Sequence, residues 1–221
     1  TALQTGRPGP LDELPHLAVS GTSTAALSPA AVARVRGGLT LASGTFAGAD
    51  ARLALSGDWT GTGGSFAAGV STVSFVSAGT QTYRDAAHQA FHGVSVGSGT
   101  RLWRSSFDAA VFTATHPAAA LEFSTTGVHV FADLTLHGGS TSTPVDLRSA
   151  ASGTPFRLNV ARSTATAARF IDADATAGPV LFANDGRSLD AGRNAGVEFR
   201  PFVLVLSPGE TFTPSTGRAG T

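Results

Sequence analysis

The chain has 221 residues, of which 42% are hydrophobic and only 14% are charged. All 15 basic residues are arginine, and 15 acidic residues balance them to a net charge of zero, so we expect no basic patch for nucleic acid. The absence of cysteine excludes disulfides and thiolate metal sites, and no apolar run approaches the roughly 18 residues of a membrane helix. We therefore expect no membrane insertion.

Short strands are predicted along most of the chain. Apolar residues recur as period-two pairs bounded by Gly, Ser, Asp or Pro, and each pair is typical of a strand with one face inward. The predicted inward residues are Leu39, Leu41, Leu53, Leu55, Phe75, Val94, Val96, Leu134, Leu136, Leu158 and Val160. Only the alanine-rich stretches 30–34 and 85–91 have the composition for a turn or two of helix.

One strand pattern recurs three times along the chain. The segments LPHLAVSG (14–21), FHGVSVG (91–97) and FADLTLHG (131–138) share the order apolar, any, small or polar, apolar, any, apolar. Self-similar units of this kind build solenoids and propellers. Propeller blades need tight antiparallel turns, which are rare here, whereas the loose Gly/Ser/Thr/Ala links suit the corners of a parallel solenoid.

The low content of charged residues also favours a parallel solenoid, because like charges stacked ~4.8 Å apart on successive coils would repel. We predict an all-β chain folded as a right-handed parallel β-helix (β-solenoid) over residues 14–199. About ten coils of some 20 residues would make it on the order of 45 Å long. Residues 1–13 are expected to form an extended N-terminal segment, and residues 200–221 a C-terminal strand or linker.

Two long segments resemble a known family. The run LTLASGTFAGADARLALSGDWTGTGGSFAAGVSTVSFVSAGTQTY (39–83), followed by FHGVSVGSGTRLW (91–103), is similar to β-helical repeats of very large secreted bacterial surface proteins. The segments 131–160 and 168–199 resemble the closing coils of that family, with a Gly192-Arg193-Asn194 turn before the final strand, although the family's usual tryptophan is missing there. The tail LVLSPGETFTPSTGRAGT (204–221) resembles the linker before immunoglobulin-like repeats. The resemblance implies an adhesin-like structural segment at the cell surface or outside the cell, with no catalytic residues and no cofactor.

Four aspartates near the C-terminal end are the best candidates for a calcium site, because hard oxygen ligands on turns can hold calcium. They are Asp172, Asp174, Asp185 and Asp190. Their spacing lacks an EF-hand loop and the nonapeptide calcium repeat, so turn aspartates that cap backbone amides are favoured over a calcium site.

Two enzymatic alternatives depend on weaker patterns. Asp85, His88 and His92 lie close in sequence and could supply the acid and base of a serine triad, but no Gly-x-Ser-x-Gly elbow accompanies them, so a solvated histidine is favoured. Arg187 and Arg193, with Asp190 and the aspartates at 172 and 174, are what remains for a polysaccharide lyase of β-helical fold. Fold analogy alone does not support that activity.

Surface binding and assembly are the remaining hypotheses. Trp59, Tyr83 and Trp103 are candidates for carbohydrate contact, although half-buried corner positions are favoured for such amphipathic rings. The alternating apolar run Phe202, Val203, Leu204, Val205 and Leu206 is suited to strand donation to a neighbour. We expect a structural or adhesive extracellular module that associates head to tail with copies of itself, with polysaccharide binding or a lyase as the alternative.

Overall fold

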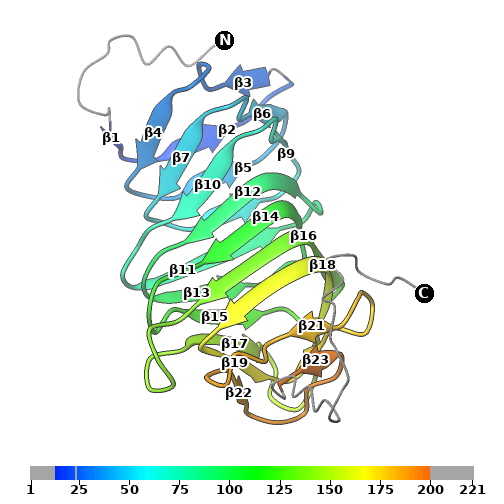
Figure 1. Ribbon diagram of the computed structural model, residues 1–221. Coiled ribbons are helices and arrows are strands. Elements are labelled where there is room, and N and C mark those ends of the chain that lie inside the picture. Colours follow the sequence, from blue (N-terminus) through cyan, green and yellow to red (C-terminus); the bar gives the residue numbers. More distant parts are fainter. Residues whose placement is uncertain (1–12, 23, 200–221) are drawn as a thin grey trace, which may run out of the picture.

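Parallel strands wind into a β-solenoid in the computed structural model, which describes residues 13–22 and 24–199 (Figure 1). Every pairing between these strands is parallel. This confirms the predicted solenoid and rules out a propeller of antiparallel blades. Of the expected terminal segments 1–13 and 200–221, only Glu13 is described, as the first residue of a strand, and the other residues lie outside the described part of the chain.

Two nine-stranded sheets run the length of the solenoid. The first sheet contains β1 (Glu13–Leu14), β4 (Val32–Val35), β7 (Arg52–Leu55), β10 (Thr72–Phe75), β12 (Ala90–Val96), β14 (Asp108–Ala114), β16 (Val128–His137), β18 (Phe156–Thr166) and β20 (Ala173–Asp174). The second sheet contains β2 (Leu17–Val19), β5 (Leu39–Leu41), β8 (Trp59–Gly61), β11 (Thr80–Asp85), β13 (Thr100–Trp103), β15 (Ala120–Phe123), β17 (Val145–Ser149), β19 (Ala168–Ile171) and β22 (Leu189–Asp190). Each coil contributes one strand to each sheet.

Two smaller sheets complete the described strands. A third sheet covers the first coils and contains β3 (Thr24–Ala26), β6 (Thr45–Ala47) and β9 (Ser65–Ala67). After β9, the last strand of this third sheet, the strands of the first sheet become longer, from four residues in β10 to seven in β12 and eleven in β18. At the C-terminal end, β21 (Leu181–Phe182) pairs with β23 (Val197–Glu198).

The coils are unequal in length. Arg52 pairs with Thr72, 20 residues later, whereas Asp133 of β16 pairs with Arg162 of β18, 29 residues later. The longer coil holds the excursion from Gly138 to Pro144 between β16 and β17. Each main sheet has nine strands, whereas about ten coils were expected from the sequence.

In these strands every second side chain is buried, as the sequence pattern predicts. All eleven residues predicted to face inward are buried, with exposed fractions of 3% or less. The two stretches with helix-forming composition are not helical: Val32–Val35 is β4, and Ala90–Val96 is β12. In β4, Ala33 and Val35 are buried while Val32 and Arg34 are exposed, and this period of two suits a strand stacked between parallel neighbours rather than a helix.

Aromatic side chains fill the middle of the core. Trp59, Tyr83, Trp103 and Phe123 are successive register partners in the second sheet, with ring centroids 5.8–6.2 Å apart. Phenylalanines of the facing sheets pack against this column, including Phe91, which lies 5.3 Å from Trp59. The stack gives each coil apolar contacts to the next coil as well as across the interior.

A buried carboxylate sits beside this column. Asp85 accepts hydrogen bonds from Trp59 Nε1 (2.8 Å), the Ala87 amide (2.9 Å) and Gln89 Nε2 (3.1 Å). Its register partner in the coil above is Gly61, and a Cβ atom on Gly61 would lie 2.1 Å from Asp85 Oδ2. A side chain at position 61 is therefore incompatible with this hydrogen-bonded carboxylate.

Polar side chains also close the corner between β10 and β11. Gln81 Nε2 donates to the carbonyls of Leu55 (2.8 Å) and Gly57 (2.7 Å) in the coil above. Its register partner Arg101, only 1% exposed, donates to five backbone carbonyls, those of Phe75, Ser77, Gly79, Ser98 and Thr100. Burial lowers the pKa of the guanidinium to about 10. Carbonyl dipoles thus solvate a buried cation here.

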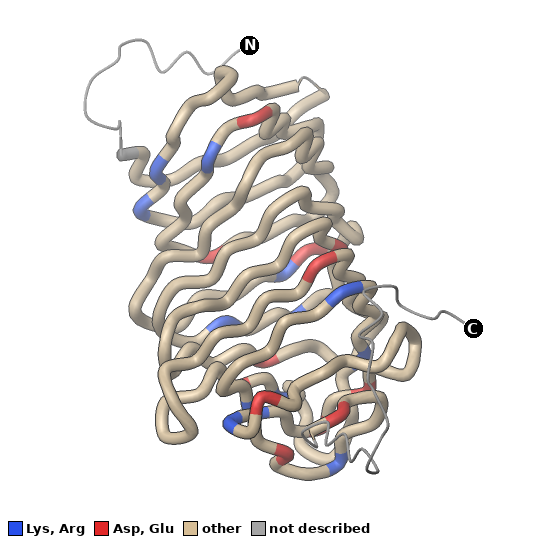
Figure 2. The backbone as a smooth tube through the Cα atoms, in the orientation of Figure 1, with Lys and Arg blue, Asp and Glu red and all other residues tan. Residues whose placement is uncertain are grey.

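Charged side chains on the outer faces stack with opposite sign. Glu122 lies between Arg104 (2.7 Å) and Arg148 (3.3 Å), and Arg162 binds Asp133 with two hydrogen bonds of 2.6 Å. Figure 2 shows how sparsely such positions occur along the solenoid. In these pairs, opposite charges lie next to one another on neighbouring coils, which is favourable where like charges would repel.

Gly61→Ala is expected to destabilise the protein, because the added methyl group would displace the Asp85 carboxylate from its three donors. Overpacking of this kind costs about 1–3 kcal/mol. Gly79→Ala is the matched control, since a Cβ there would meet only Ser77 Oγ, at 3.6 Å. Urea unfolding followed by tryptophan fluorescence measures both variants, and equal midpoints for the two would contradict the packing argument.

His129 makes stability depend on pH. It is 0% exposed, neither ring nitrogen has a hydrogen-bond partner, and the ring packs against Phe107 (5.2 Å) and Phe123 (4.9 Å). Burial lowers its pKa from 6.5 to about 3. Between these values the unfolded chain binds a proton that the folded chain does not, so the free energy of unfolding falls as the pH drops, by about 1.4 kcal/mol per unit.

His129→Leu should remove this contribution, and the difference between variant and parent should grow from pH 7 to pH 4.5. Unfolding curves at a series of pH values measure it. A difference that stays constant across this range would show that the histidine does not titrate on unfolding.

Candidate functional site

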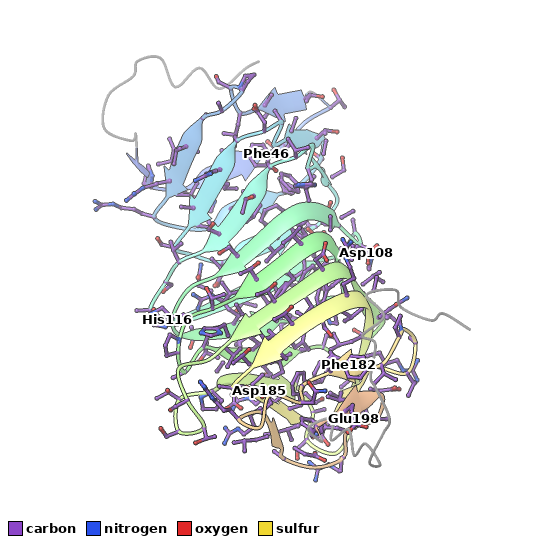
Figure 3. The ribbon with its side chains drawn as sticks, viewed as in Figure 1. Phe46, Asp108, His116, Phe182, Asp185 and Glu198 are labelled. Carbon is purple, nitrogen blue, oxygen red and sulfur yellow. The ribbon has the colours of Figure 1, made fainter. Side chains whose placement is uncertain are left out.

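A pocket of about 240 Å³ opens at one corner of the solenoid, where links from three successive coils lie next to one another. Its walls are Asp85, Ala86, His88, Ser105, Ser106, Thr126 and Gly127. These residues lie at the end of β11 and in the links from β11 to β12, β13 to β14 and β15 to β16. Figure 3 labels Asp108 at this side of the strand stack, where β14 begins.

Three side chains beside the pocket form a continuous hydrogen-bonded row. His88 Nε2 is 2.8 Å from Asp108 Oδ1, and His88 Nδ1 is 3.2 Å from Ser106 Oγ. The side chains of His88 and Asp108 are 46% and 40% exposed, so the row is accessible to solvent. The arrangement connects a hydroxyl, an imidazole and a carboxylate in the order that serine nucleophiles use.

Backbone packing holds Ser106 in place. Gly127 lies one coil below, and a Cβ atom on it would approach Ser106 Oγ to 2.4 Å. The neighbouring Ser105 Oγ accepts a 3.1 Å hydrogen bond from the Asp85 amide in the coil above. Ser106 therefore lies between the coil that contains Asp85 and the coil that contains Gly127. The absence of a side chain on Gly127 leaves room for the Ser106 hydroxyl.

Of the three residues weighed for a triad from the sequence, only His88 belongs to this row. Asp85 is buried and binds Trp59, while His92 is exposed on β12. The residues that partner His88 are Ser106 and Asp108, 18 and 20 residues further on. Adding the length of one coil to position 88 would have identified Ser106 and Asp108 as candidate partners of His88.

The four aspartates proposed for calcium bind separate parts of the C-terminal coils. Asp172 binds Arg193, whose hydrogen bond holds the pKa of that carboxyl below its ordinary value, and Asp174 accepts from Thr176. The remaining pair accept turn amides: Asp185 from Ala167 and Ser188, and Asp190 from Gly192. Across residues 13–22 and 24–199, no three Asp, Glu or His side chains are placed to hold a metal ion together.

The lyase candidates are likewise not brought together as a cleft. Arg193 is committed to the Asp172 carboxylate, which the Gly153 amide also contacts at 3.0 Å. Arg187 lies on an exposed turn whose amide is bound by Asp185, at 3.2 Å. These groups stabilise turns at the C-terminal end of the solenoid.

The carbohydrate-contact prediction for Trp59, Tyr83 and Trp103 is wrong. Their exposed fractions are 0%, 1% and 1%, because they form the aromatic column of the core. Rings buried in this way cannot stack on a sugar, and the half-buried corner positions also considered for them are not where they lie. The assembly residues 202–206 fall outside the described part of the chain.

A second hollow, of about 320 Å³, lies on the outer face of the first sheet near its N-terminal end. It is lined by Arg34, Arg36, Ala54, Ser56 and Val76. Arg34 is the register partner of Ala54, whose small side chain leaves space beneath the guanidinium. Figure 2 shows arginines gathered on this part of the molecule.

No family model, curated protein or solved structure matches the chain. Among residues 13–22 and 24–199 there is also no helix long and apolar enough to cross a membrane.

Proposed function

We propose that the chain is a structural module of an extracellular surface, acting through length and stiffness. The observation that supports this most is the continuity of parallel stacking: the two main sheets extend through nine strands each, from β1 and β2 to β20 and β22. A solenoid of this kind is stabilised by contacts between neighbouring coils, so it resists bending along its whole length. The extracellular assignment rests on the family resemblance of the sequence.

Self-association follows from the same architecture. Among the described strands, β1, β2 and β22 have a neighbour on one side only, whereas the outer side of β20 carries a single bridge between Asp174 and Ala195. Such strand edges invite pairing with another chain, and the alternating run 202–206 has the composition for a donated strand. A contact between the two different ends of the solenoid is heterologous, so it propagates head to tail into a filament.

Deletion of residues 202–221 should abolish this assembly. We expect the full chain to show concentration-dependent growth in light scattering, and the truncated chain to remain a monomer. Deletion of residues 210–221 alone is the control, because it keeps the apolar run and should still assemble. A monodisperse full chain of 22.2 kDa at high concentration would end the filament proposal.

Binding of an acidic polysaccharide is the second candidate function, supported by the hollow beside Arg34. Guanidinium groups donate charge-assisted hydrogen bonds to carboxylates, and the Val76 side chain offers an apolar wall for a sugar ring. In this second candidate function the sugar binds on the outer face of the first sheet and not at the buried aromatic rings.

Arg34→Ser should weaken binding of polygalacturonate about tenfold, because one charge-assisted contact is lost. Arg162→Ser is the matched control, since Arg162 is an exposed arginine of the same sheet that is paired with Asp133. Affinity electrophoresis with polygalacturonate and with neutral dextran measures the effect. Equal retardation of the two variants would contradict a site at this hollow.

A further inference from the structure

The row formed by Asp108, His88 and Ser106 has the connectivity of a serine nucleophile with its base. Asp108 Oδ1 lies 2.8 Å from His88 Nε2, a distance at which the carboxylate accepts the Nε2–H. That contact fixes the tautomer in which Nδ1 carries a lone pair. Ser106 Oγ, 3.2 Å from Nδ1, can then donate its proton to the imidazole.

The surroundings suit a small reactant. Ser106 borders the pocket of about 240 Å³, whose other walls include the hydroxyl-bearing residues Ser105 and Thr126. No apolar side chain larger than Ala86 lines it, so it provides room for a short acyl group rather than a long chain. Asp85, the second carboxylate at the pocket, is held by the indole of Trp59 and does not interrupt the row.

We propose that Ser106 is an acyl-accepting nucleophile and that the corner pocket hydrolyses small carboxylic esters, such as acetyl esters. The inference does not depend on the structural role proposed above. In the first step, Ser106 Oγ bonds to the carbonyl carbon while its proton passes to His88 Nδ1. The ester C–O bond then breaks, and the alcohol leaves with that proton.

Water completes the cycle. A water molecule gives its proton to His88 and bonds to the acyl carbon, the Ser106 ester breaks, and the proton returns to Ser106 Oγ, so that one carboxylic acid is released per water consumed. Ser106 and His88 are the catalytic residues of this scheme. Asp108 is a positioning residue, because it acts by holding the His88 tautomer.

The test uses the full chain with p-nitrophenyl acetate, following p-nitrophenol release and the mass of the protein. We expect a transient gain of one acetyl group, located on the peptide that contains Ser106. Ser106→Ala and His88→Gln should each lower the rate about 100-fold or more, the usual contribution of a nucleophile or general base. Ser106→Cys should restore acylation, which separates loss of the nucleophile from loss of the fold.

Two further variants decide whether the row itself acts. His92→Gln is the matched control, because His92 is an exposed histidine of β12 outside the row, and it should keep the parent rate. Asp108→Asn should lower kcat with little change in KM and should alter the pH profile, which a purely structural role would not do. No reaction, acetyl groups spread over several residues, or parent rates in Ser106→Ala would each overturn the proposal.

Discussion

Register between coils is the constraint on which the other features of this structure depend. Each strand hydrogen-bonds to the corresponding strand of the next coil, so every side chain lies directly above or below its register partner. Inside the solenoid this produces the column from Trp59 through Tyr83 to Trp103. Outside, it places Glu122 beside its register partner Arg148 and Asp133 beside its register partner Arg162. Where a buried group needs space, the partner must be small, as Gly61 is in the coil above Asp85.

The same constraint generates the corner pocket. His88 comes from one coil, Ser106 and Asp108 from the next, and Gly127 from the coil after that, so residues about one coil apart in sequence meet at a single place. The corners are also where the chain is free of the strict alternation that strands impose. A solenoid can therefore carry polar chemistry at its corners while its interior stays packed with apolar side chains.

The sequence predicted the fold better than the site, for a physical reason. Period-two burial is a local property, and it identified Leu39, Phe75 and Val160 as inward residues without knowledge of the coil length. Contacts between coils require the register, which in the first sheet varies from 17 residues between Phe156 and Ala173 to 29 between Asp133 and Arg162. No single period predicts both. Asp85 and His92 therefore looked like partners of His88 because they are close in sequence.

Burial of the aromatic rings illustrates the same limit. Trp59 and Trp103 were expected at exposed or half-buried positions because their rings are amphipathic. In the solenoid each ring packs against rings of neighbouring coils 20 or more positions away, in addition to the nearer Phe66 and Phe107. The aspartates at 185 and 190 were interpreted correctly as turn caps, because an Asx turn is local.

The buried Arg101 guanidinium has a mechanical consequence. Together, Arg101 and Gln81 bind backbone carbonyls at one corner in three successive turns, from Leu55 and Gly57 through Phe75 to Ser98. Separating these turns breaks the side-chain hydrogen bonds of Gln81 and Arg101 as well as the strand ladder. The solenoid therefore resists separation of its coils more strongly at this corner than where the ladder alone joins them.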